Sequence, residues 1–69
     1  MNYSYIISGT CNAYPIKSKY FKNSAKALKY LDKLLVNYNL QVEDIYNIDD
    51  ITTTYVANNY TRFSITKIA

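Results

Sequence analysis

One stretch of helical hydrophobic periodicity constrains the fold of this 69-residue chain more than any other feature of its sequence. When the residues between 25 and 38 are placed at 100° intervals, their apolar side chains fall within a stripe roughly 120° wide. The stripe consists of Ala27, Leu28, Leu31, Leu34, Leu35 and Tyr38. We therefore predict one amphipathic helix over about residues 25–38, with an apolar face that must pack against another element.

Residues suited to the two ends of a helix flank this stripe. Ser24 can accept a hydrogen bond from one of the free N–H groups of the first turn. Asn39 suits the left-handed position that often follows a helix, and Leu40 suits the apolar contact that accompanies it. These side chains predict a helix that begins after Ser24 and ends before Asn39.

The remaining segments alternate apolar and polar residues, which is typical of β-strands. We predict strands at about residues 3–9, 14–21, 42–48, 51–57 and 60–68. The segment from Gly9 to Asn12 is the expected first turn, and Pro15, which has no N–H group, belongs at a strand start or sheet edge. The predicted fold class is α+β, a single two-layer domain in which an antiparallel sheet of four to five strands packs on one helix, in the order β-β-α-β-β-β.

The last two predicted strands flank Asn58 and Asn59, which tolerate the positive φ angles of a type I′ turn. A two-residue loop would pair Tyr55 with Arg62. Because side chains alternate between faces along a strand, this register would place Val56, Phe63 and Ile65 toward the helix. It would place Tyr55, Tyr60 and Arg62 together on the opposite face of the sheet.

The composition argues against several kinds of catalysis. The chain has no histidine and only one cysteine, Cys11, so the commonest general base, an internal disulfide and a multi-cysteine zinc site are excluded. Phosphate-binding loops need several glycines, and this chain has one. The acidic residues Glu43, Asp44, Asp49 and Asp50 match no calcium loop and suit a solvated turn. We predict a protein that is not an enzyme and needs no cofactor or metal.

Positive charge is concentrated between residues 17 and 33. The six lysines of this region are Lys17, Lys19, Lys22, Lys26, Lys29 and Lys33. On the predicted helix, Lys26, Lys29 and Lys33 lie within about 60° of one another, opposite the leucines. This stripe can be an ordinary solvated face, or it can contact nucleic acid, another anion or an acidic partner.

Tyr55, Tyr60 and Arg62 form the second candidate surface. Tyrosine and arginine are enriched at the energetically dominant positions of protein interfaces, and aromatic side chains also stack on nucleic-acid bases. The alternative is structural, because Arg62 could simply stack on the ring of Tyr55. We predict that these three residues contact a partner protein.

The cysteine content also bears on localisation. A single cysteine is typical of reducing compartments, and no apolar run is long enough for a signal peptide or a membrane span. We therefore predict a cytoplasmic protein that does not associate with membranes. A domain this small buries little surface on folding, so a homo-oligomer is one way to gain stability.

Two segments carry a resemblance to known proteins: Lys19-Tyr20-Phe21-Lys22, which leads into the helix, and the hairpin segment 56–63, Val-Ala-Asn-Asn-Tyr-Thr-Arg-Phe. In size, composition and layout the chain resembles small accessory proteins of phages and mobile elements of A/T-rich Gram-positive bacteria. The resemblance implies an anti-defence protein, of which anti-CRISPR proteins are examples. Inhibitors that mimic DNA are strongly acidic, whereas this chain has a net charge of +3.

Two functional hypotheses follow. The first is a non-enzymatic interaction protein, phage-encoded, that binds and blocks a host immune protein or complex in the host cytoplasm. The second is a nucleic-acid or nucleotide-binding module that uses the lysines of the helix and of the preceding strand.

Overall fold

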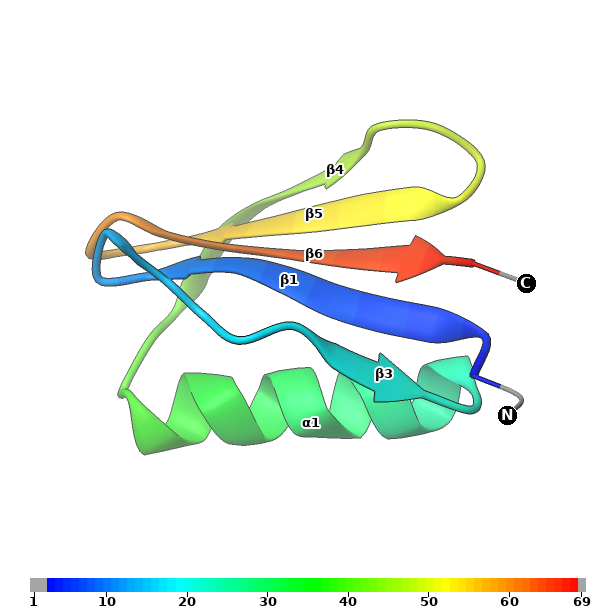
Figure 1. The fold of residues 1–69 in the computed structure, drawn as a ribbon. Helices are drawn as coiled ribbons and strands as arrows, with labels where there is room; N and C mark the ends of the chain where they lie inside the picture. Colours follow the sequence, from blue (N-terminus) through cyan, green and yellow to red (C-terminus); the bar gives the residue numbers. More distant parts are fainter. Residues whose placement is uncertain (1–2, 69) are drawn as a thin grey trace.

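In the computed structural model, which describes residues 3–68, one helix lies against a six-stranded antiparallel sheet (Figure 1). In chain order the elements are β1 (Tyr5–Cys11), β2 (Tyr14–Pro15), β3 (Lys19–Phe21), α1 (Ser24–Asn37), β4 (Val42–Asn47), β5 (Thr52–Ala57) and β6 (Thr61–Lys67). The predicted α+β class is confirmed. The sheet has one strand more than expected, because the strand predicted at 14–21 is two short strands, β2 and β3.

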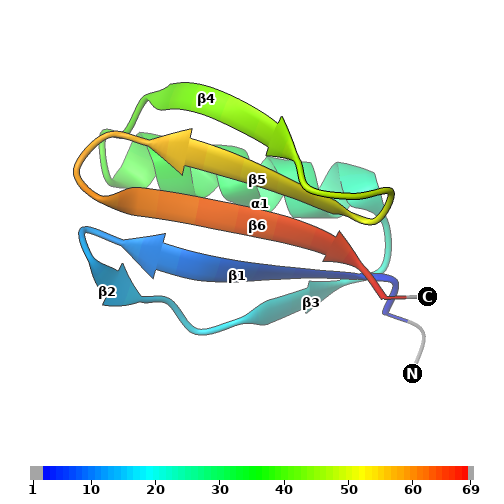
Figure 2. The same ribbon diagram turned by 90° about the horizontal axis from the view of Figure 1, so that it is seen from above.

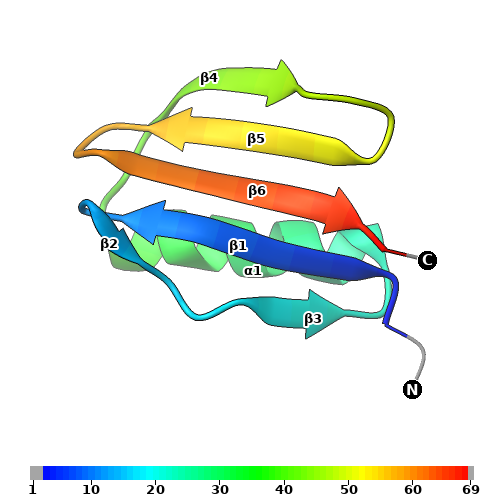
Figure 3. The ribbon, with the colours of Figure 1, turned by 45° about the horizontal axis from the view of Figure 1, so that its top comes forward.

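The first and last long strands of the chain pair with each other in the middle of the sheet. The strand order is β2-β1-β6-β5-β4, and β3 also pairs with β1, on the side where β2 lies (Figures 2 and 3). Strand β4 therefore forms one edge of the sheet, and β2 and β3 form the other. Pro15 lies in the edge strand β2, as predicted.

The core lies between α1 and one side of the sheet. Its buried apolar residues are Ile7, Ala27, Leu31, Leu40, Ala57, Phe63 and Ile65. Of the predicted helical stripe, Ala27 and Leu31 are buried, but Leu28 and Tyr38 are 46% and 54% exposed.

The helix is turned so that its buried side extends to Tyr30, which the predicted stripe omitted. The Tyr30 ring packs on the Phe21 ring of β3 with 5.2 Å between their centroids. Because this contact lies beside an edge strand, α1 runs below β1 and β3 (Figure 1), away from β4.

The predicted N-terminal cap of the helix was wrong by one residue. Asn23, with an extended backbone, accepts the Lys26 N–H at its Oδ1 over 2.9 Å, and Ser24 is the first helical residue. The prediction at the other end is confirmed. Asn39 has φ 53°, and the N–H of buried Leu40 donates to the Leu35 carbonyl over 2.8 Å.

The first predicted turn was also misplaced. Gly9 lies inside β1, and the turn is formed by Asn12 and Ala13. Gly9 has φ 141°, and a Cβ at this position would overlap the carbonyl oxygen of Arg62 on β6. Glycine is thus required by the close approach of two central strands, and strand β1 continues past it to Cys11.

The register predicted for the last hairpin was wrong by one residue. The loop contains three residues, Asn58 to Tyr60, so that Ala57 pairs with Thr61 and Tyr55 pairs with Phe63. A one-residue shift moves every side chain of one strand to the other face. Phe63 and Ile65 face the helix as expected. On β5, however, Tyr55 takes the helix-facing side and Val56 the open face of the sheet.

We expect Gly9→Ala to destabilise the fold strongly, because the added methyl group must displace backbone in the two central strands. The expected loss is at least about 2 kcal/mol, which lowers the melting temperature of a domain this small by roughly 10 °C. Thermal unfolding followed by circular dichroism measures it. Ser8→Ala in the same strand is the matched control, and a similar melting temperature for both variants would contradict the role given to Gly9.

Candidate protein-binding site

The β1–β2 turn and the β5–β6 loop lie side by side at the end of the molecule where the helix also ends, on the left in Figure 1. We call this surface the loop tip and define it by its exposed residues: Asn12, Ala13, Tyr14, Tyr38, Asn59 and Tyr60. The β1–β2 turn and the β5–β6 loop are joined by two hydrogen bonds. The Asn12 N–H donates to Thr61 Oγ1 over 3.0 Å, and the Ala13 N–H donates to the Tyr60 carbonyl over 3.1 Å.

Further hydrogen bonds hold the β5–β6 loop in place. The Thr61 side chain is 1% exposed, and its hydroxyl donates to the Asn59 carbonyl over 3.2 Å while accepting from Asn12. Asn58 is tied to Gln41, after the helix, because its N–H donates to the Gln41 carbonyl and its Oδ1 accepts the Gln41 N–H. These bonds therefore hold the two loops of the loop tip in one arrangement.

The backbone of the loop tip is strained. Positive φ angles occur at Asn12 (53°), Ala13 (69°), Asn59 (57°) and Tyr60 (55°). Asparagine tolerates this conformation, whereas for other L-residues it costs about 1–2 kcal/mol each. The hydrogen bond from the Ala13 N–H to the Tyr60 carbonyl holds both residues in this conformation. Strain of this kind concentrates at functional sites.

Three tyrosine side chains extend from this fixed backbone. Tyr60 is 87% exposed, Tyr14 is 77% exposed and Tyr38 is 54% exposed. Tyr14 and Tyr38 line one cavity of about 530 Å³ between β2 and the end of α1. Rigid tyrosines among asparagines are the composition of antibody binding loops, where they provide a large contact area at a low entropy cost.

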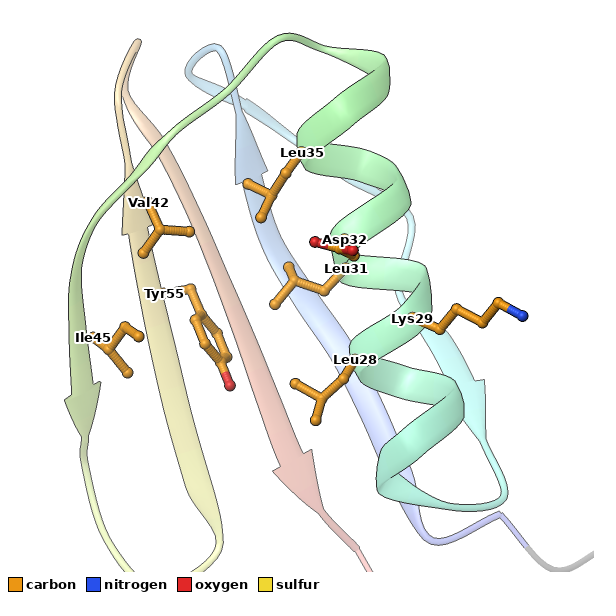
Figure 4. A pocket seen from close by; sticks show the side chains of 8 residues that line it. All are labelled: Leu28, Lys29, Leu31, Asp32, Leu35, Val42, Ile45 and Tyr55. Carbon is orange, nitrogen blue, oxygen red and sulfur yellow. The ribbon is translucent and has the colours of Figure 1, made fainter.

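The structure does not bring the three predicted contact residues together. Tyr55 points toward the helix and is half-buried, as Figure 4 shows, while Arg62 is exposed on the open face. Tyr60 lies in the loop rather than in a strand. The structure therefore excludes the alternative of a Tyr55–Arg62 stack, and of the three residues only Tyr60 lies at the loop tip.

The centre of the open face of the sheet carries hydroxyl side chains, and the tyrosines on this face, Tyr20 and Tyr46, lie on its edge strands. Thr10 pairs with Arg62, and Ser8 and Thr54 both pair with Ser64. The Thr54 and Ser64 hydroxyls are 2.9 Å apart, and Thr54 is 6% exposed. Short polar side chains that bond to one another offer less binding energy than aromatic anchors.

All six lysines singled out in the sequence are exposed. Lys19 lies on β3, where its Nζ is 4.6 Å from the centroid of the Tyr30 ring. Lys29 extends to the side of α1 away from β4 and β5, and it also lines the cavity between α1 and these strands (Figure 4). Because α1 lies beside β3, the positive charge is concentrated on the side of the molecule away from β4.

Sequence reasoning found Tyr60 but missed Tyr14 and Tyr38. Tyr38 follows the helical period of the apolar stripe and was interpreted as core. Tyr14 was interpreted as an ordinary strand residue. The positive φ angles of Ala13 and Tyr60 have no local signal, because neither residue type favours them.

Comparisons with known proteins do not identify a relative of this chain. No family model, curated protein sequence or solved structure matches the chain. Within residues 3–68 there is no group of three or more potential metal ligands of the His, Cys, Asp or Glu type. No helix in the described part of the chain is long and apolar enough to cross a membrane.

We expect Tyr60→Gly to stabilise the protein, because glycine adopts positive φ without strain and the lost ring is exposed. Ala13→Gly should act in the same way. Each change should raise stability by about 1 kcal/mol and the melting temperature by roughly 4–8 °C. Asn58→Gly, which removes the side-chain oxygen that accepts the Gln41 N–H, should lower it. Destabilisation by both Tyr60→Gly and Ala13→Gly would show that the loop tip is not strained.

Proposed function

We propose that this protein is a non-enzymatic interaction protein that binds a partner protein through the loop tip. The observation that carries the proposal is Tyr60, a bulky side chain held at φ 55° and left 87% exposed. Folding alone would favour glycine at this position. A contact between the Tyr60 ring and another molecule would explain why an aromatic residue occupies this strained and exposed position.

The resemblance to phage accessory proteins extends the proposal. We infer that the chain is a phage-encoded inhibitor that acts in the host cytoplasm and blocks an immune protein or complex, as anti-CRISPR proteins do. A rigid loop tip suits stoichiometric inhibition, because a preorganised surface loses little entropy on binding.

Affinity purification from a Gram-positive host that expresses the tagged protein tests the binding site. We expect the wild type and Ala13→Gly to retain the same host protein, and Tyr60→Gly to lose it. A central tyrosine contributes about 2 kcal/mol or more to an interface, which is roughly a thirtyfold loss of affinity. Both variants relieve backbone strain, so only the ring distinguishes them. Equal retention by Tyr60→Gly would rule out the loop tip.

Phage plating tests the inhibitor hypothesis separately. In a strain whose CRISPR system targets a phage, expression of the wild-type protein should restore plaque formation, and expression of Tyr60→Gly should not. The same assay can be repeated in strains with different defence systems. If the protein binds a host protein but restores plaque formation in none of them, it is an interaction protein and not an anti-defence factor.

A nucleic-acid or nucleotide-binding module is the second candidate, favoured by the exposure of all six lysines. If phosphates bind there, affinity for labelled DNA or RNA should fall steeply with salt, about tenfold or more between 50 and 200 mM for several contacts. Fluorescence anisotropy at both concentrations measures this. Lys26→Gln with Lys33→Gln should reduce the salt slope, and Tyr60→Gly should leave it unchanged. Absent or salt-independent binding would exclude this candidate.

A further inference from the structure

Strand β4 differs from every other long strand, because all six of its residues are exposed. It pairs with β5 on one side only, so its other edge faces solvent. An edge strand of this kind presents backbone groups with which another strand can pair. Strand β4 contains neither lysine nor proline, two residue types that commonly block such pairing.

An apolar groove runs beside this edge, because α1 lies below β1 and β3 and leaves part of the helix-facing side of β4 and β5 uncovered. The groove has a volume of about 510 Å³. Figure 4 shows Val42, Ile45 and Tyr55 on one wall and three leucines of α1 on the other. Leu28, Val42 and Ile45 are 46%, 37% and 55% exposed, so apolar surface is left without cover.

The electrostatics of this side are unusual for a basic protein. The chain has five acidic residues, and all of them lie on or beside the groove and β4: Asp32, Glu43, Asp44, Asp49 and Asp50. Asp32 and Lys29 line the groove, and Asp50 and Lys67 line a neighbouring cavity, so the five acidic residues outnumber the lysines on this side. A ligand for this side should therefore carry positive charge.

The edge of β4 is guarded by Asp44. Its Oδ1 accepts the N–H of Ile45 over 2.9 Å, and its Oδ2 accepts the phenol of Tyr46 over 2.8 Å. This hydrogen bond and the charge of Asp44 raise the pKa of Tyr46 above its ordinary value. An incoming strand must draw the Asp44 carboxylate away from the Ile45 N–H, and a cationic side chain can do so.

We propose that β4 and the groove bind an extended, basic segment of a partner protein, which adds to the sheet as a strand beyond β4. Its backbone pairs with the free edge, and its alternate side chains cover Val42 and Ile45 and reach into the groove. Its lysines or arginines pair with the carboxylates along the edge. This surface is separate from the loop tip, and the proposal goes beyond the proposed function.

A second copy of this chain is a poorer occupant. Pairing β4 with β4 would bring Glu43 and Asp44 of one copy beside the same acids of the other, and like charges across paired strands are destabilising. The register shift between Val42 and Asp44 also interrupts a regular edge where two copies would meet. A partner segment of opposite charge avoids the repulsion, and the complex then contains one register shift instead of two.

A displayed library of random ten-residue peptides, selected on the full-length protein, tests this proposal. Peptides that bind Ile45→Ser are removed first, because this neutral change disrupts the groove without favouring either charge. We expect the enriched sequences to alternate apolar residues with lysine or arginine. No enrichment, or enrichment of acidic or uncharged peptides, would overturn the proposal.

The enriched peptide, once synthesised, tests each part of the contact by fluorescence anisotropy. N-methylation of alternate amides and the change Leu28→Lys should each weaken binding at least about tenfold. Asp44→Asn, which keeps the side-chain oxygen but removes the charge, should weaken it about twofold to fivefold. Unchanged affinity after N-methylation would exclude strand addition.

Two further measurements separate the alternatives. Tyr60→Gly should bind the peptide like the wild type. The hypothesis that the loop tip binds a partner and the hypothesis that β4 binds a peptide can therefore fail independently of each other. Circular dichroism verifies that each variant is folded. If light scattering instead finds a dimer that Ile45→Ser abolishes, the occupant of the edge is a second copy and the proposal is wrong.

Discussion

The pairing of β1 with β6 is the constraint on which the rest of this structure depends. It joins the two ends of a 69-residue chain over a run from Tyr5–Lys67 to Thr10–Arg62, and it works because Gly9 lets the strands approach closely. The same pairing sets the β1–β2 turn beside the β5–β6 loop, so the loop tip is a direct product of the central ladder. The same strand pairing thus forms the centre of the sheet and positions the candidate binding surface.

Local features of the sequence were sufficient to predict the fold class, the single helix and its left-handed end at Asn39. Each of these depends on residues that are close together along the chain. The register of the last hairpin was not predictable in this way. Bonds between Asn58 and Gln41, which are 17 positions apart, hold Asn58 in a loop of three residues instead of two. The resulting shift moved Tyr55 to the helix side and separated it from Arg62.

The position of the helix on the sheet was also not predictable from the sequence. Periodicity identified the apolar stripe but not the strand that the helix would lie against. The contact of Tyr30 with Phe21 fixes α1 near the β3 edge, and this position exposes Leu28 and opens the groove beside β4. Tyr38 could not be assigned to the loop tip for the same reason, because its exposure depends on how far the helix extends past the sheet.

Positive and negative charges lie on different sides of the folded chain. Lysines concentrate on α1 and β3, and the acids concentrate along β4, so the molecule carries an electric dipole across the width of its sheet. In the field of a charged macromolecule, a dipole experiences a torque before contact. Such alignment shortens the rotational search that precedes docking, and it affects the rate of encounter more than the lifetime of the complex. The fold can thus present a chosen edge to a partner while the two molecules are still separated by solvent.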